Sequence, residues 1–228
     1  MASFWSQAEH LQFAAANSGQ IRLQSDEGRM IVELLQKEGG KEIKNIVEIG
    51  TWNGLGSTMC ILQGIQGKHV QFWSLECNKE KHDAALDSLS DIIDERVKLL
   101  WGSIVDISGV TSESYLSNFP SLMESDTLKA WFKVDLENCA VCPKVLDELP
   151  EHIDFLLLDG GEFTTLYEFS LLLGRCTKYI VLDDTLIDKC KEVRKVLMDK
   201  FEWCEIICLD TRNGFSIFER VPCGELPY

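Results

Sequence analysis

The chain lacks the features that mark membrane proteins, nucleic-acid-binding proteins and multidomain chains. Its 228 residues contain no apolar run of about eighteen or more, so no membrane-spanning helix and no membrane insertion is expected. Lys and Arg number 22 against 37 Asp and Glu, a net charge of −15, and they form no basic block. A nucleic acid is therefore excluded as the main partner, because a phosphate backbone demands a positive footprint. With no repeat and no Pro- or Ser-rich linker, a single domain over 1–228 is expected.

The N-terminal residues also lack the basic segment and apolar run of a secretory signal. Nine cysteines, an odd number, are scattered through a chain too long to need disulfide staples, which indicates reduced thiols and a cytoplasmic protein. Cys139 and Cys142 have the spacing of zinc ligands but no second pair to complete a site, so buried free thiols are expected. The acidic composition suits a small-molecule or glycan partner, and it leaves the oligomeric state open.

Short apolar runs bounded by polar or turn residues predict strands. They are Asn45–Gly50, Val70–Glu76, Val97–Trp101, Asp154–Asp159, Tyr179–Asp183, Trp203–Leu209 and Phe215–Glu219. Helical spacing is found in Ser57–Ile65, Lys79–Leu89, Thr164–Leu173 and Asp188–Lys200. Several strands are apolar throughout, as in a parallel sheet that is covered on both faces. The alternation predicts a doubly wound α/β fold.

The C-terminal part follows a different pattern. Asn213-Gly214 stands between the last two strands with no helix between them. Asn-Gly is a strong hairpin signal because both residues tolerate positive φ. We therefore predict a seven-stranded, mostly parallel, Rossmann-like sheet that ends in an antiparallel hairpin.

Two regions fall outside this pattern. Residues 1–44 predict an N-terminal helical cap, in which Ser25 is a helix N-cap. Residues 104–153 are too long for a simple connection and predict helices of their own, including Thr127–Phe132 and Lys144–Leu149. This second region, called the insert below, is our candidate for substrate recognition, with Trp131 and Asp135 as possible sugar contacts.

The stretch NIVEIGTWNGLGST, residues 45–58, joins the first strand to a helix with very few large side chains. Gly50 and Gly54 allow a sharp turn and close approach of a ligand, and the helix that begins near Ser57 offers free N–H groups. Glu76 ends the second strand, where a carboxylate is placed to accept both hydroxyl hydrogens of a ribose. Together they favour a bound nucleoside. Alternatively, the glycines serve only the turn and the acid is solvated.

The spacing of acid, one residue, Gly, three residues, Gly resembles the first motif of class I S-adenosylmethionine (SAM) methyltransferases rather than the dinucleotide pattern G-x-G-x-x-G. The likeness spans roughly residues 25–220, and Gly102-Ser103 resembles a later motif that lies beside the adenine. The resemblance implies SAM as cofactor. The implied cofactor residues are Glu48, Gly50, Thr51, Trp52, Asn53, Gly54, Ser57, Glu76, Cys77, Gly102, Ser103 and Asp159.

The segments IDFLLLDGGEFTTLYEF and YIVLDDT resemble metal-assisted O-methyltransferases, including those that modify sugars. That resemblance implies that Asp159, Asp183 and Asp184 hold Mg²⁺ or Mn²⁺, a hard ion that prefers oxygen ligands. The ion would chelate the acceptor oxygens and favour the alkoxide. The implied activity is methylation of a hydroxyl of a sugar or glycan.

One position departs from the family pattern. Sugar-acting relatives often carry His, and catechol-type enzymes Lys, where this chain has Glu162. Glu162 and Asp159 are the candidate catalytic residues; the alternative for Glu162 is that it caps the following helix. Metal-independent methylation with Asp159 as base stays open, as do two other classes, a catalytically silent methyltransferase-fold module and an NAD-dependent oxidoreductase.

Overall fold

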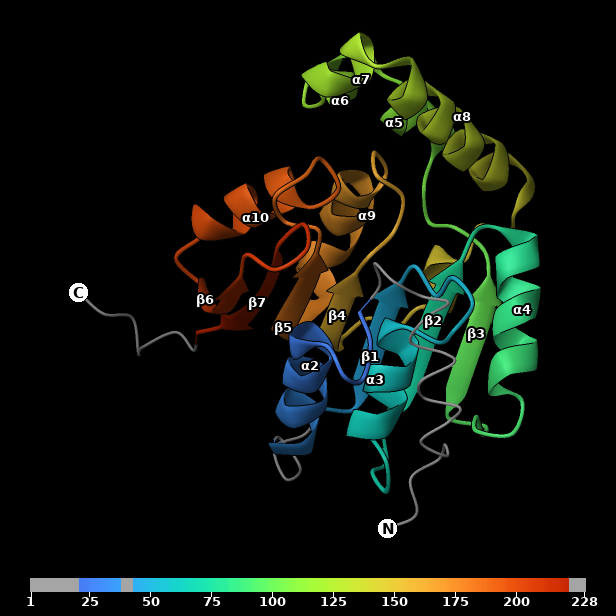
Figure 1. Ribbon diagram of the computed structural model, residues 1–228, viewed down its shortest axis with the longest axis vertical. Helices are drawn as coiled ribbons and strands as arrows, with labels where there is room; N and C mark the ends of the chain where they lie inside the picture. Colours follow the sequence, from blue (N-terminus) through green and yellow to red (C-terminus); the bar gives the residue numbers. More distant parts are fainter. Residues whose placement is uncertain (1–20, 38–42, 222–228) are drawn as a thin grey trace.

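A seven-stranded sheet forms the centre of the protein, shown as a computed structural model that describes residues 21–37 and 43–221 (Figure 1). The strand order is β3-β2-β1-β4-β5-β7-β6. The strands are β1 (Asn45–Ile49), β2 (Gln71–Glu76), β3 (Val97–Trp101), β4 (Ile153–Leu158), β5 (Cys176–Asp183), β6 (Trp203–Leu209) and β7 (Phe215–Arg220). Neighbours pair in parallel except β7, which runs antiparallel to both β5 and β6. The predicted fold class and the closing hairpin are confirmed.

Helices cover both faces of the sheet because neighbouring strand residues point to opposite sides. The helices that flank the sheet are α2 (Asp26–Lys37), α3 (Ser57–Gly64), α4 (Lys79–Leu89), α9 (Thr165–Leu172) and α10 (Lys191–Met198). On one face Ile31 of α2 and Ile61 of α3 belong to the same apolar core as Phe155 of β4. On the other face Phe169 of α9 and Val193 of α10 belong to a second core. This arrangement leaves the carboxyl ends of the parallel strands open for a site.

The start of α2 follows the sequence prediction. The Ser25 hydroxyl oxygen accepts a hydrogen bond from the backbone N–H of Gly28 at 3.2 Å, and Asp26 and Glu27 lie in the first turn. The acidic first turn suits the positive end of the helix dipole. Residues 1–20 of the predicted N-terminal cap lie outside the described residues.

The α-helices of the insert form a separate layer above the carboxyl ends of the strands (Figure 1). Its helices are α5 (Ile107–Val110), α6 (Glu113–Leu116), α7 (Pro120–Glu124), α8 (Asp126–Val141) and the 3₁₀ turn η1 (Leu146–Glu148). The predicted helix at 127–132 lies inside α8. The prediction for 144–149 is only partly right, because Pro150 disfavours a helical conformation of the residue before it.

A third apolar core attaches the insert to the rest of the molecule. Phe163, in the β4–α9 loop, makes edge-on ring contacts with Phe119 and Phe132 of the insert at centroid distances of 5.4 and 5.7 Å. The hydroxyl of Tyr115 donates to the carbonyl oxygen of Phe163 at 2.8 Å and accepts the backbone N–H of Tyr167 at 3.1 Å. The insert is therefore anchored to the loop that follows β4.

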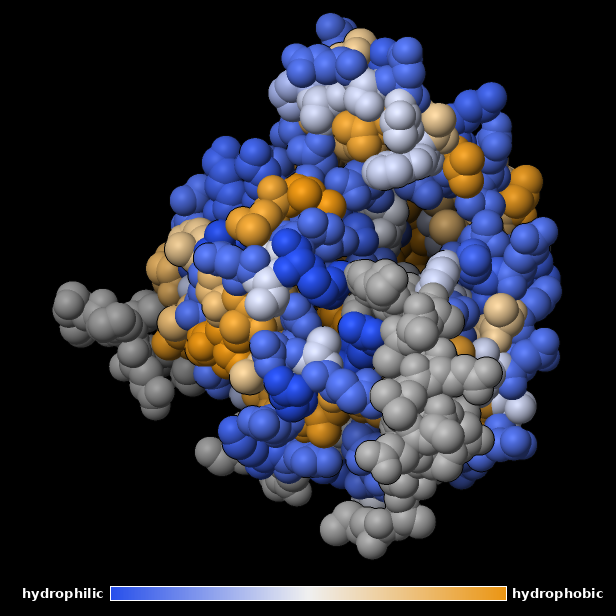
Figure 2. Space-filling view, in the orientation of Figure 1, coloured by the Kyte–Doolittle hydropathy of each residue, from blue (hydrophilic) through white to orange (hydrophobic). Residues whose placement is uncertain are grey.

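The visible surface is mainly hydrophilic, and a recess opens between the insert and the body of the molecule (Figure 2). Within residues 21–37 and 43–221, no helix has the length and apolar character needed to cross a bilayer.

Candidate functional site

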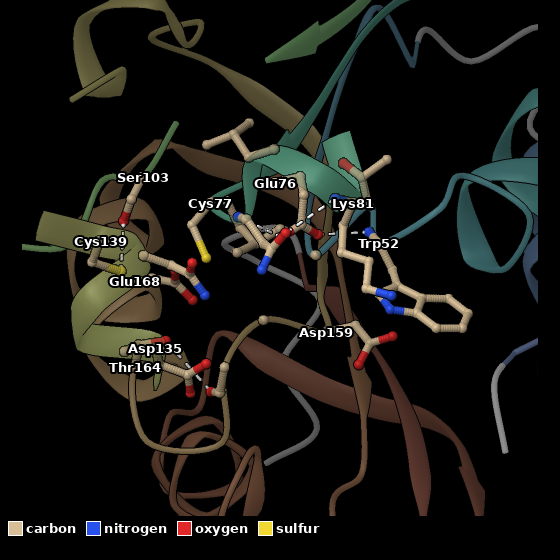
Figure 3. Close-up of a pocket in the computed structure, with 18 of the residues that line it drawn as sticks. Trp52, Glu76, Cys77, Lys81, Ser103, Asp135, Cys139, Asp159, Thr164 and Glu168 are labelled. Atoms are coloured by element: carbon tan, nitrogen blue, oxygen red, sulfur yellow. Dashed lines mark hydrogen bonds between the residues drawn. The ribbon is translucent and has the colours of Figure 1, made fainter. Parts of the chain in front are cut away.

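A cavity of about 370 Å³ lies at the carboxyl ends of β1, β2 and β4 and reaches α8 of the insert (Figure 3). Most of the predicted cofactor residues line it. These are Gly50, Thr51, Trp52, Ser57, Glu76, Cys77, Gly102, Ser103 and Asp159. Glu48, Asn53 and Gly54 are not part of its wall. The cavity has the size of a small-molecule site.

Gly50 lets the first loop pass directly against the chain that follows β4. Its φ is +100°, and a Cβ atom on it would lie 2.0 Å from the carbonyl oxygen of Asp159. Its N–H and that of Thr51 both donate to the carbonyl oxygen of Leu75 at 3.0 Å. Only glycine fits a position that combines positive φ with so close a backbone contact.

Gly54 and Asn53 support the loop instead of facing the cavity. A Cβ on Gly54 would lie 2.7 Å from Leu89 of α4, so this glycine lets α4 pack closely. The Asn53 side-chain oxygen accepts the N–H of Leu55 at 3.1 Å. These two residues shape the turn that presents the wall residues.

Glu48 is fully buried beneath the loop. Its carboxylate accepts hydrogen bonds from the hydroxyls of Ser57 at 2.6 Å, Thr58 at 2.7 Å and Ser74 at 2.5 Å. Burial raises the pKa of Glu48 to about 7, although the hydroxyls oppose the shift. Glu48 therefore joins β1, β2 and the start of α3 from below, and one of its partners, Ser57, lines the cavity.

Glu76 faces the cavity at the end of β2. Its Oε2 accepts the backbone N–H of Trp52 at 2.7 Å, and its Oε1 accepts that of Asn78 at 2.9 Å. Burial raises its pKa. Because each carboxylate oxygen has two acceptor sites, a fixed pair of acceptor positions remains for the hydroxyls of a ligand.

The wall opposite Trp52 carries acids that come from distant parts of the chain (Figure 3). Of the two candidate sugar contacts, Asp135 of α8 lines the cavity, whereas Trp131 is half exposed and is not part of the wall. Glu168 of α9 was missed because no local motif marks it. Its Oε2 is buried without a hydrogen-bond partner among the described residues. Burial raises the pKa of Asp135 to about 6 and that of Glu168 well above its usual range.

The three predicted metal ligands do meet. Carboxylate oxygens of Asp159, Asp183 and Asp184 lie within 4.8 Å of one another at the ends of β4 and β5. However, Nζ of Lys189 lies 2.7 Å from Asp159 and 2.7 Å from Asp184, and Arg212 pairs with Asp183 at 3.1 Å. The sequence prediction missed both cations.

The three aspartates, Lys189 and Arg212 form a compact ionic network. Burial raises the pKa of Asp183 to about 7, and the neighbouring carboxylates add to the effect. Burial alone would lower the pKa of Lys189, but the carboxylates of Asp159 and Asp184 raise it well above its usual value. Lys189 is therefore a charged ammonium group, and the three carboxylates already have two cationic partners.

Glu162 lies in the β4–α9 loop beside this network. Its carboxylate accepts the backbone N–H of Lys189, and burial raises its pKa. The residue is half-buried and is not part of the cavity wall. Its role as a base stays a prediction.

Solved structures with a similar fold are numerous, whereas no protein-family model and no curated protein matches the sequence. An O-methyltransferase from Bacillus cereus in complex with S-adenosylhomocysteine (SAH) is 18% identical, with a TM-score of 0.61 over 94% of this chain and 90% of its own. A methyltransferase from Geobacter sulfurreducens is 15% identical, with a TM-score of 0.60 over 97% and 91% of the two chains. The O-methyltransferase TomG from Streptomyces achromogenes, in complex with SAM, is 13% identical, with a TM-score of 0.59 over 94% and 88%.

These similarities extend over nearly the whole length of both chains. At such low identities, these similarities indicate the fold but not the substrate or the mechanism. The chain has the Rossmann-like fold of these methyltransferases.

Proposed function

We propose that this protein is a SAM-dependent O-methyltransferase, a conclusion that depends above all on the Glu76 carboxylate in the wall of the cavity. Its two oxygens are fixed by the N–H groups of Trp52 and Asn78, next to the Gly50 turn. A ribose offers two adjacent hydroxyl donors to such a pair of acceptors.

The rest of the wall fits the chemistry of SAM. The cofactor carries further donors and positive charge in its adenine amino group, its α-ammonium group and its sulfonium. The cavity offers Asp135, Asn138 and the unpartnered oxygen of Glu168 as acceptors. Buried acceptors without a partner are costly, so a ligand rich in donors is favoured.

A dinucleotide fits this wall less well. A pyrophosphate needs several N–H groups or cations around it. Among the described wall residues the cationic side chains are Lys81, which lies 4.9 Å from the centre of the Trp52 ring, and Lys189, which is bound to carboxylates. The acidic wall therefore argues against the NAD-dependent oxidoreductase.

The proposed reaction is a displacement at the methyl carbon. A bond forms between the acceptor oxygen and the methyl group while the bond from sulfur to that carbon breaks, and the sulfonium becomes a neutral thioether. The hydroxyl proton passes to the carboxylate of Asp159, which lines the cavity; Glu162 is the second candidate for this role. Most of the acceleration should come from holding the two reactants in line.

The acceptor we propose is a hydroxyl of a small molecule, with a sugar or glycan as the first class to screen. Support for a sugar comes from the sequence resemblance of the segments around Asp159 and Asp183, and the acidic composition is compatible with a neutral acceptor. Assistance by Mg²⁺ or Mn²⁺ is the variant of this mechanism that the same resemblance implies. It requires Lys189 to leave the carboxylates that it contacts.

A calorimetric titration of SAH into the purified protein tests the proposal. We expect saturable binding for the wild type and a loss on the order of tenfold to a hundredfold for Glu76→Gln, which puts an amide donor against a backbone donor. Glu80→Gln, at an exposed position on α4, is the matched control and should bind like the wild type.

Heat no larger than dilution in a folded sample would refute the methyltransferase proposal. A parallel titration with NAD then separates the remaining classes. Binding of NAD weakened by Glu76→Gln would favour the oxidoreductase, and binding of neither cofactor would favour the silent module.

A further inference from the structure

Lys189 occupies the centre of the acidic cluster at the ends of β4 and β5. It lies in the loop between β5 and α10, and its Nζ donates to Oδ1 of Asp159 and contacts Oδ2 of Asp184, both at 2.7 Å. Its side chain is only 15% exposed, and it lines the cavity. The ammonium group thus bridges carboxylates from two neighbouring strands.

A divalent ion would need the same space. Mg²⁺ binds carboxylate oxygens at about 2.1 Å, so an ion that bridges Asp159 and Asp184 would compete directly with Nζ for the space between their oxygens. The third carboxylate, Asp183, is already paired with Arg212 at 3.1 Å. The residues present therefore do not fit a metal ion while Lys189 holds this position.

The charge balance of the cluster also argues against a metal ion. Even if all three carboxylates are ionised, Lys189 and Arg212 compensate two of their three negative charges. Adding a divalent ion would give this buried cluster a positive excess and place the ion against an ammonium group at short range. The lysine side chain supplies the charge that a metal ion would otherwise bring.

We propose that Lys189 is a built-in replacement for the metal ion, so that the site works without a divalent cation. This inference rests on the proposed methyl transfer. The ammonium group binds the acceptor oxygen from the cavity side and stabilises the negative charge that develops as its proton passes to Asp159. Lys189 stays protonated throughout and is a catalytic residue that touches the acceptor.

The decisive measurement is binding of Mn²⁺, followed by calorimetry and by the electron paramagnetic resonance signal of the free ion, with no cofactor present. We expect no stoichiometric binding by the wild type. Lys189→Met should create a site that involves Asp159 and Asp184 and should tighten Mn²⁺ binding by at least about tenfold. Adding Asp159→Asn to that variant should abolish the gain.

Lys191→Met, at an exposed position at the start of α10, is the matched control and should leave Mn²⁺ binding unchanged. Stoichiometric binding of Mn²⁺ by the wild type, lost in Asp159→Asn, would overturn the proposal. So would a folded Lys189→Met protein that binds no Mn²⁺. If Lys189→Met does not fold, Lys189→Arg keeps the cation and should still exclude Mn²⁺; binding by that variant would also contradict the proposal.

A second readout connects the proposal to activity. Once an acceptor has been identified, methyl transfer by the wild type should be insensitive to a chelator. The Lys189→Met variant should lose activity and recover part of it when Mn²⁺ is added. Loss of wild-type activity on chelation, restored by Mn²⁺, would refute the replacement. Because Mn²⁺ binding is read without cofactor, failure of this inference is distinguishable from failure of the proposed function, which SAH binding decides.

Discussion

Glu48 should make the protein less stable as the pH rises, and Glu48→Gln should remove that dependence. The carboxyl group has no exposed surface, and burial raises its pKa from 4.5 to about 7. Because the folded-state pKa is the higher one, the unfolded chain loses its proton first as the pH rises. The stabilisation is therefore complete below the unfolded pKa and is lost progressively up to the folded pKa.

The size of the stability loss follows from the width of the pH range between the unfolded and the folded pKa of Glu48. Each pH unit between the two pKa values changes the free energy of unfolding by about 1.36 kcal/mol. A practical range begins near pH 5.5, since a chain with a net charge of −15 at pH 7 loses charge and solubility in more acid solution. Between pH 5.5 and the folded-state pKa of about 7, roughly 1.5 pH units remain. Raising the pH from 5.5 to 8 should therefore lower the free energy of unfolding by about 2 kcal/mol.

Urea unfolding at several pH values, followed by tryptophan fluorescence and circular dichroism, measures this loss. Other buried acids also titrate, so the informative quantity is the difference between the wild type and Glu48→Gln. That difference should move by about 2 kcal/mol in favour of the variant between pH 5.5 and 8. The exposed control Glu80→Gln should differ from the wild type by less than about 0.5 kcal/mol throughout.

A difference between wild type and Glu48→Gln that is constant with pH would refute the reasoning. It would mean that the hydroxyls of Ser57, Thr58 and Ser74 keep Glu48 ionised at its ordinary pKa despite burial. A change in the opposite direction would mean that these hydroxyls outweigh the desolvation of the carboxylate.

Three further variants test the loop and the insert. Gly50→Ala should cost about 3 kcal/mol or more in unfolding free energy, because its Cβ meets a backbone oxygen at 2.0 Å. Gly67→Ala, also at positive φ but with nothing within 4 Å, should cost about 1 kcal/mol, and equal losses would contradict the steric explanation. Tyr115→Phe removes two hydrogen bonds between the insert and the β4–α9 segment and should cost about 1–2 kcal/mol, with faster amide hydrogen exchange in α5 and α6. Unchanged exchange there would show that the apolar contacts alone hold the insert.

The fold was predictable because its strongest signals are local. Apolar runs set the strands, and Asn213-Gly214 set the final hairpin, where Gly214 has φ +88°. The predicted start of β5 at Tyr179 was wrong: the strand begins at Cys176, because Cys176–Lys178 is more polar than the core of the strand and yet pairs with β4 at Ile153. Strand ends are determined by pairing partners, which a single sequence does not display.

Within the site, the position of a residue in the cavity wall could be predicted where that residue follows directly from a strand end. Glu76 and Asp159 come immediately at or after β2 and β4, so the topology alone places them at one edge of the sheet. Glu168 was not predictable, because its place in the cavity depends on how α9 is seated beneath α8. Glu48 was placed in the correct motif, but that it lies under the loop and not in the cavity depends on three hydroxyl partners from two elements.

The acid cluster shows why residue type and spacing alone do not identify a metal site. Three buried carboxylates at neighbouring strand ends repel one another, and an unpaired buried charge costs several kcal/mol, so the carboxylates must either take up protons or have cationic partners. The sequence displays the carboxylates together but not the source of any cation. Lys189 and Arg212 come from loops after β5 and β6, and only the folded chain brings their side chains back to the cluster. A prediction of metal dependence from such a pattern therefore depends equally on the basic residues of the following loops, which decide whether the cation is an added ion or part of the chain itself.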